Sequence, residues 1–165
     1  MNFRLREVGL EFLATAPVRL VFEAWVPARR DKVFAAVTAD PATWSWFPTL
    51  SGGSYEGAGP YGVGSGREVR AAGVRYRETI MAWDEPARWA YRINESSAPM
   101  NRALLEGWEF EDGGDRTLVR WTFAADPRLG FRVILLFGRT IVGWAFRRAM
   151  RNLGAQLSAR PASLN

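Results

Sequence analysis

The most extended pattern of apolar and polar positions lies between Pro127 and Arg160 and predicts one long amphipathic helix. In its first half the segment carries a second apolar side, formed by Phe137, Ile141 and Trp144. A helix that is apolar on two sides needs cover on both, so we expect the rest of the chain to surround it there. At 3.6 residues per turn, the principal apolar face consists of Leu135, Val142, Phe146, Ala149, Leu153 and Leu157.

Before that helix, short segments of alternating apolar and polar residues predict antiparallel strands. The first runs from Val18 to Val26, where every second side chain is apolar, and Pro27 ends it. A Gly-Gly pair between two aspartates at 112–115 is a strong hairpin signal. The later predicted strands span 67–72, 74–83, 88–96, 102–111 and 116–125.

Two short helices are predicted directly after the first strand. The first spans 29–39, and Asp40 ends it because proline disfavours helical geometry in the residue before it. Asp40 then caps a second helix that begins at Pro41 and continues to Pro48. A single strand, two helices, further strands and a long final helix indicate an α+β fold with helices on one face of a bent sheet.

The glycine-rich segment 52–66 is predicted to be a flexible connection between strands. It contains the spacing G-x-G-x-x-G at 57–62, which marks a dinucleotide site only between a strand and a helix. Here a strand follows instead, so we expect no dinucleotide site.

The length of 165 residues fits one domain, for which we expect a leader at 1–16, the folded domain at 17–160 and a tail at 161–165. The leader has apolar residues with which it could lie over the domain. It has no continuous apolar segment of the secretory type, so a cytoplasmic location is expected. The apolar run 133–137 is too short to span a bilayer.

The chain contains no cysteine and no histidine. Disulfides, thiolate metal sites, serine triads and the commonest metal ligand are therefore excluded, and we expect no metal and no cofactor. Any catalysis would have to use carboxylates, tyrosine, arginine or water, which lowers the expectation of an enzyme.

The formal net charge is +5, and Lys32 is the single lysine among 22 basic residues. Arginine binds carboxylates and phosphates in bidentate geometry, so a basic surface suits anionic lipid or an acidic ligand. The arginines are spread along the chain and no RNA-binding or zinc-finger signature accompanies them. Nucleic acid is therefore not an expected partner.

Several local sequences carry a resemblance to a known family: VFEA at 21–24, DKVFAAV at 31–37, DPATWSWFP at 40–48, GSGR at 64–67, ETIMAWDEPARWAY at 78–91 and GDRTLVRW at 114–121. Over about residues 18–158 the chain resembles the START-like, or Bet v 1-like, superfamily (SRPBCC), in its bacterial polyketide cyclase/dehydrase and lipid-transport branch. The resemblance implies a helix-grip: a seven-stranded curved antiparallel sheet around the long C-terminal helix, which together enclose a cavity for an apolar ligand. Members bind lipids, sterols, quinones or polyketides, and a minority catalyse cyclisation or dehydration.

Strand alternation places two carboxylates, Glu78 and Glu106, among inward-facing apolar residues. A buried carboxylate needs a partner, a proton or a ligand, so both are candidate acid/base groups or polar anchors, with Arg67 as a counter-ion. The alternative is that each glutamate forms a purely structural ion pair with a neighbouring arginine, or that a bulge in the strand puts it on the other face of the sheet. The full set of predicted ligand-binding residues is Trp44, Trp46, Phe47, Arg67, Tyr76, Glu78, Tyr91, Glu106, Trp108, Trp121, Leu135, Val142 and Phe146.

Three classes of function follow from these features. The first is a binding module for a hydrophobic small molecule, lipid or polyketide-like, held between the sheet and the long helix. The second is a cofactor-free cyclase or dehydratase that uses Glu78 or Glu106. The third is an interaction protein that forms a homodimer or makes peripheral membrane contact through the patch of Phe137, Ile141 and Trp144.

Overall fold

A computed structural model describes residues 1–159 of the chain as one curved sheet with helices packed against it. The strands are β1 (Phe3–Arg4), β2 (Val18–Val26), β3 (Leu50–Tyr55), β4 (Gly66–Ala71), β5 (Val74–Asp84), β6 (Arg88–Ser96), β7 (Asn101–Asp112) and β8 (Thr117–Pro127). The helices are α1 (Phe12–Thr15), α2 (Arg30–Thr38) and α3 (Leu129–Ser158), with a 3₁₀ turn, η1, at Pro41–Thr43.

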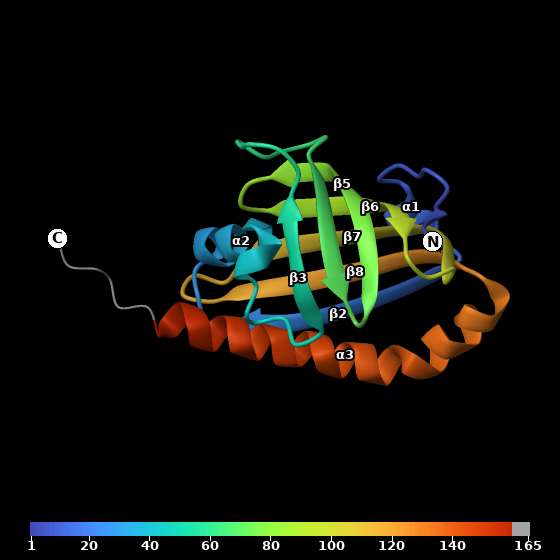
Figure 1. Cartoon of the computed structure of the whole chain (residues 1–165). Coiled ribbons are helices and arrows are strands. Elements are labelled where there is room, and N and C mark those ends of the chain that lie inside the picture. Colours follow the sequence, from blue (N-terminus) through green and yellow to red (C-terminus); the bar gives the residue numbers. More distant parts are fainter. Residues whose placement is uncertain (160–165) are drawn as a thin grey trace.

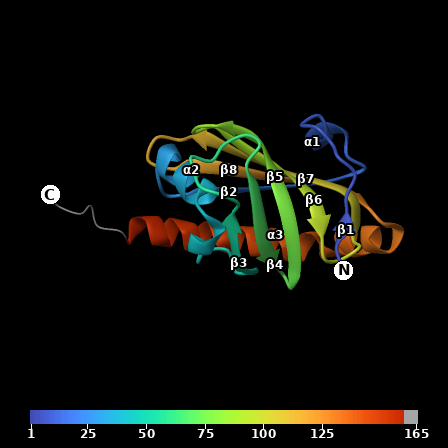
Figure 2. The same cartoon turned by 45° about the horizontal axis from the view of Figure 1, so that its top comes forward.

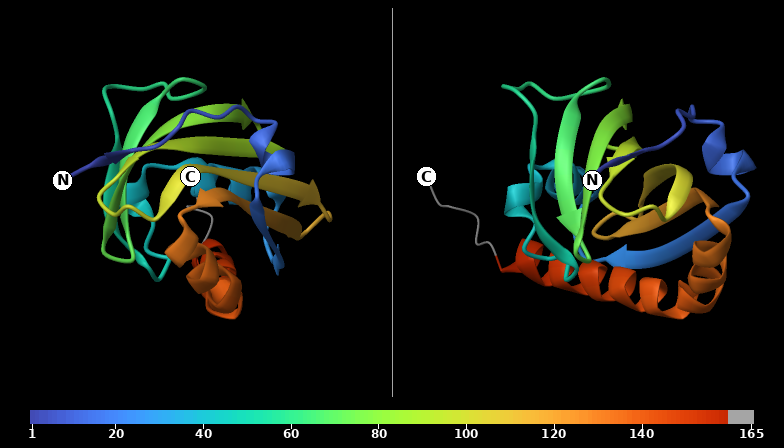
Figure 3. Two further views of the ribbon diagram at one scale, coloured as in Figure 1. Left: turned by 90° about the vertical axis from the view of Figure 1, so that its right-hand side faces the viewer. Right: turned by 45° about the vertical axis from the view of Figure 1, so that its right-hand side comes forward.

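The sheet is antiparallel, with the strand order β2-β8-β7-β6-β5-β4-β3, and β1 adds a short eighth strand beside β6. Figure 1 shows α3 running along the sheet, and Figure 2 shows α2 and α1 at opposite ends of it. Viewed from the end, the sheet arches over α3, which lies across its open side (Figure 3, left). The α+β helix-grip predicted from the sequence is confirmed.

The edge strand β2 has the bounds that the alternation pattern predicts. Leu20, Phe22 and Val26 are buried on its concave side, while Arg19 and Glu23 on the other side are exposed. The opposite edge strand, β3, lies in the glycine-rich segment for which the sequence predicts a flexible connection, so that prediction is wrong for residues 50–55. At Gly53 a Cβ atom would lie 2.5 Å from the carbonyl oxygen of Glu68, so glycine is needed there for β3 to pair closely with β4.

The prediction of a second short helix after β2 is wrong beyond the first turn of that helix. Asp40 does cap it, accepting a hydrogen bond from the backbone N–H of Ala42 at 2.9 Å, but only the 3₁₀ turn η1 forms. Trp44 and Trp46 are both buried. Residues two apart point to nearly opposite sides of a helix, so burying both rings requires the extended chain seen here.

The N-terminal segment lies over the convex face of the sheet. Val8 and Phe12 are buried there against Leu105 and Ala124. Leu5 is also buried, in the larger core. The predicted tail at 161–165 lies outside the described residues.

Helix α3 packs closely on β2 through glycines. A Cβ at Gly143 would lie 2.8 Å from the ring of Phe22, and one at Gly154 would lie 2.7 Å from the ring of Pro27. Side chains at these positions would push the helix away from the strand.

A matched pair of glycine substitutions tests this packing. We expect Gly154→Ala to lower the free energy of unfolding by about 1–3 kcal/mol, because the proline ring cannot give way. Gly138→Ala, where no atom lies within 4 Å of the added Cβ, is expected to raise the free energy of unfolding by roughly 0.5–1 kcal/mol through helix propensity. Urea unfolding of both variants measures the difference. Equal effects would mean that α3 is not held against Pro27.

The second apolar side of α3 is not covered by the sheet, so the expectation that the chain surrounds the helix is wrong. The side chains of Phe137, Ile141 and Trp144 are 83 %, 71 % and 51 % exposed. The helix touches the sheet along one side only, with Phe146 and Leu153 fully buried on that side.

Candidate functional site

A cavity of about 360 Å³ lies between the concave face of the sheet and α3. All seven strands of the main path and α3 contribute to its mostly apolar and aromatic lining. Thr49 and Ala72 are the exposed members of this lining, and Phe131 in the first turn of α3 lines it too. The cavity therefore opens between the β4–β5 turn, which points toward α3 in Figure 3, and the helix. Its volume falls within the roughly 300–1,000 Å³ typical of small-molecule sites.

Polar side chains cross the inner wall of this cavity in a band, one from each of five neighbouring strands. In register, Arg67 on β4 stands directly opposite Glu78 on β5, and Tyr91 on β6 stands opposite Glu106 on β7. Directly paired residues point to the same face of a sheet, so each pair is within contact distance. The polar band consists of Arg67, Glu78, Tyr91, Glu106 and Trp121.

The first pair in the polar band is a buried salt bridge. The Nε of Arg67 donates to Oε2 of Glu78 at 2.5 Å, and the side chains are 1 % and 4 % exposed. The Arg67 guanidinium also lies 4.3 Å from the ring centroid of Tyr91 and 4.6 Å from that of Trp89, within the range of cation–π attraction. Within residues 1–159 its Nη1 has no hydrogen-bond partner. A buried donor of this kind is left for water or a bound molecule.

The second carboxylate, Glu106, is held by two donors. The hydroxyl of Tyr91 donates to Oε2 at 2.5 Å and Nε1 of Trp121 donates to the same oxygen at 3.0 Å. No hydrogen bond to Oε1 is found within the described part of the chain, and Glu106 is only half-buried because it faces the cavity. That oxygen can meet a polar group of a molecule in the cavity.

Burial sets the protonation of these carboxylates. It raises the pKa of Glu106 to about 7, even though the hydrogen bonds from Tyr91 and Trp121 favour the ionised form. It also raises the pKa of Glu78, and the Arg67 guanidinium offsets part of that rise. Near neutral pH Glu106 is therefore close to the midpoint of its titration and can give or take a proton.

The cavity brings together most of the predicted ligand-binding residues. Trp46 and Phe146 do not line it, because Trp46 packs behind Trp44 at a ring distance of 4.8 Å and Phe146 packs on Trp121 at 5.7 Å. The predicted residues that do line it are Trp44, Phe47, Arg67, Tyr76, Glu78, Tyr91, Glu106, Trp108, Trp121, Leu135 and Val142.

Sequence reasoning missed the lining residues that lie near the opening. Thr49 and Leu50 lie where the unpredicted strand β3 begins, so no alternation pattern assigned them a face. Asn101, at the start of β7, lines the cavity as a buried polar residue. The predicted strand begins at residue 102, one position after Asn101, so strand alternation did not assign Asn101 a face.

The described residues contain no group of three or more acidic, histidine or cysteine side chains arranged to hold a metal ion. In the cavity, the polar band supplies hydrogen-bond donors and acceptors that can contact a ligand.

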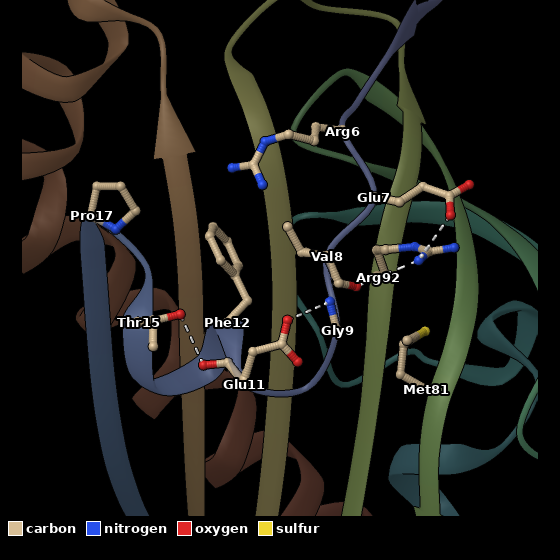
Figure 4. Close-up of a pocket in the computed structure, with 10 residues that line it drawn as sticks. All are labelled: Arg6, Glu7, Val8, Gly9, Glu11, Phe12, Thr15, Pro17, Met81 and Arg92. Atoms are coloured by element: carbon tan, nitrogen blue, oxygen red, sulfur yellow. Dashed lines mark hydrogen bonds and ion pairs between the residues drawn. The ribbon is translucent and has the colours of Figure 1, made fainter.

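A second hollow, of about 580 Å³, lies on the convex face beneath the N-terminal segment (Figure 4). It is open to solvent, and its polar groups already pair with one another. Arg92 reaches Glu7 at 3.6 Å and the carbonyl of Val8 at 3.5 Å, as Figure 4 shows. The internal cavity is therefore the better site for an apolar molecule.

Most of the chain matches a known protein family. Residues 17–158 match the family described as polyketide cyclase / dehydrase and lipid transport. An uncharacterized protein of Mycobacterium tuberculosis is 30 % identical over 160 residues, which cover 94 % of this chain and 94 % of that protein.

Solved structures show the same fold. The Zhui aromatase/cyclase from Streptomyces sp. R1128 aligns with a TM-score of 0.71 and 18 % identity, covering 88 % of this chain and 98 % of that chain. A START superfamily protein from Mycobacterium smegmatis aligns with a TM-score of 0.68 and 15 % identity, covering 84 % and 98 %.

Proposed function

From the premise that this chain belongs to the polyketide cyclase / dehydrase and lipid transport family, we propose that it binds a hydrophobic small molecule, lipid or polyketide-like, in the cavity between the sheet and α3. The observation that carries the proposal is an apolar cavity whose inner wall bears a few fixed polar groups. Such a site binds the apolar body of a ligand by burial and orients it by hydrogen bonds. Polar atoms of the cavity lining that have no hydrogen-bond partner within residues 1–159 can make those bonds, among them the Nη1 of Arg67, the Oε1 of Glu106, the Oδ1 of Asn101 and the Nε1 of Trp108.

A Val→Trp pair tests the site. Val142 lines the cavity from α3, whereas Val21 lies on the convex face of the sheet. With N-phenylnaphthylamine as a neutral fluorescent probe, we expect the wild type to bind one molecule per chain. Val142→Trp is expected to weaken that binding by about tenfold or more, a loss of about 1.4 kcal/mol, because the indole fills part of the cavity. Val21→Trp is expected to bind as the wild type does. Unchanged affinity in a folded Val142→Trp variant would contradict the proposed site.

A second candidate function, a cofactor-free cyclase or dehydratase, is favoured by one observation. Glu106 has a pKa of about 7 in the cavity and lies in a short hydrogen bond with Tyr91. A carboxylate with that pKa can remove a proton from a carbon next to a carbonyl group and return it elsewhere.

One experiment separates the two functions. Native mass spectrometry of the protein purified from its own host, followed by organic extraction, identifies what occupies the cavity. A single apolar species supports binding alone. A pair of species related by ring closure or loss of water, of which Glu106→Gln retains only the precursor, supports catalysis. A chain that carries nothing and does not bind the fluorescent probe would contradict both.

A further inference from the structure

Within residues 1–159, the outer face of α3 is the largest collection of exposed apolar side chains. Seven of the ten large hydrophobic residues that are exposed within the described range lie on this one helix. Monomeric proteins rarely leave so continuous an apolar stripe in water, which makes it a candidate contact surface. We define the outer face as Leu129, Val133, Ile134, Leu136, Phe137, Ile141 and Trp144.

The opposite side of the same helix belongs to the fold. Phe131, Leu135 and Val142 line the cavity, while Phe146 and Leu153 are fully buried farther along. The outer face is thus one helix diameter from the opening of the cavity. Figure 3 shows that the helix bends in its N-terminal part, drawn in orange, so that this part leaves the line of the remaining turns.

The charges of α3 indicate what covers the outer face. The helix carries five arginines and no acidic residue. Within residues 1–159 none of the five forms a salt bridge, although ten arginines elsewhere do. One of them, Arg148, lies 5.3 Å from the ring of Trp144. The five are Arg132, Arg139, Arg147, Arg148 and Arg151.

An apolar stripe flanked by arginine, with tryptophan at its border, is the pattern of a helix that lies in the plane of a membrane interface. We propose that the outer face of α3 docks on an anionic lipid surface, with the helix axis parallel to the membrane and the opening of the cavity beside the bilayer. The inference rests on the proposed function, because docking would bring the opening of the cavity to within about one helix diameter of the bilayer and so shorten the path of an apolar ligand through water.

Two other arrangements fit the helix less well. The helix is long and apolar enough, by length and composition alone, to cross a membrane. Spanning would require Phe146 and Leu153 to leave the core and would bring arginines into the hydrocarbon, at high cost. A dimer through this face would bring two sets of arginines together without a carboxylate on α3 to neutralise them.

Flotation with lipid vesicles tests the docking. We expect the wild type to bind vesicles of equimolar phosphatidylcholine and phosphatidylglycerol and to bind pure phosphatidylcholine weakly, with binding that falls as salt screens the charges. The double variant Phe137→Gln with Ile141→Gln is expected to lose about tenfold or more of this affinity. Arg139→Gln is expected to lose about fivefold, the value of one cation near an anionic surface.

The control is Val63→Gln, which removes an apolar side chain that is 68 % exposed outside α3 and should leave vesicle binding unchanged. Each variant is also titrated with N-phenylnaphthylamine in the absence of vesicles. Normal probe binding without vesicle binding by the wild type would overturn the docking while leaving the proposed function intact. A concentration-dependent dimer in sedimentation that the double variant abolishes, again without vesicle binding, would overturn it in favour of a second copy of the chain.

Discussion

Replacing Arg67 with methionine is expected to lower the free energy of unfolding by about 3–5 kcal/mol. The cost arises because Glu78 would be left as an uncompensated carboxylate in a site where its side chain is 4 % exposed. The Tyr91 and Trp89 rings that now face the guanidinium cannot replace it as a partner. Urea unfolding near neutral pH measures the change.

Two further variants identify the cause of that loss. In Arg67→Met with Glu78→Gln no charge remains unpaired, and most of the stability should return, since neutral groups often replace a buried ion pair at little cost. Arg120→Met breaks exposed salt bridges with Glu23 and Glu109 and should cost at most about 1 kcal/mol. A double variant as unstable as Arg67→Met would show that packing, and not the charge on Glu78, accounts for the loss.

The positions of Glu78 and Glu106 were predictable because alternation fixes which face of a strand each side chain takes. Their partners were only partly predictable. Arg67 stands opposite Glu78 across a turn of two residues, Ala72 and Gly73, so the register follows from local sequence. The pairing of Tyr91 with Glu106 depends on the register across a longer connection, which alternation alone leaves open.

The outer face of α3 shows the limit of pattern reasoning in another way. The periodicity correctly identified Phe137, Ile141 and Trp144 as a second apolar side. It could not decide what covers them, because that depends on how far the sheet reaches around the helix. The sheet ends at the edge strand β2, which contacts one side of α3 only.

In the cavity, too, local sequence patterns predict some parts, while other parts depend on contacts between distant segments. Its deep wall consists of strand residues in regular register, such as Trp108 and Trp121, which stand opposite one another on β7 and β8. Its opening is lined by Thr49, Ala72 and Phe131, which come from three distant parts of the chain. Local patterns therefore predicted the wall and not the opening, which decides how a ligand enters.

Stability is expected to fall as pH rises between about 4.5 and about 7 because of Glu106. In the unfolded chain this carboxyl releases its proton near its ordinary value of 4.5, whereas in the folded protein burial raises its pKa to about 7. Between these values the folded state holds one more proton than the unfolded state, so each rise of one pH unit favours unfolding by about 1.4 kcal/mol. Over the window the loss approaches roughly 3 kcal/mol, and it is complete above the folded pKa.

Glu106→Gln isolates this contribution, because the amide does not titrate and its oxygen can still accept hydrogen bonds from Tyr91 and Trp121. The difference in free energy of unfolding between wild type and variant, measured by urea unfolding from pH 4 to pH 8, should therefore shift steadily in favour of the variant as pH rises. Glu111→Gln removes an exposed carboxylate from the same strand, one that forms no salt bridge within residues 1–159. It serves as the control and should lose stability with rising pH as the wild type does, because Glu106 is intact. A constant difference between Glu106→Gln and wild type would mean that Glu106 has the same pKa in the folded and the unfolded protein, and that it is therefore ionised near neutral pH. The proton needed for catalysis near neutral pH would then have to come from another group, whereas binding through Arg67 and an ionised Glu106 would still be available.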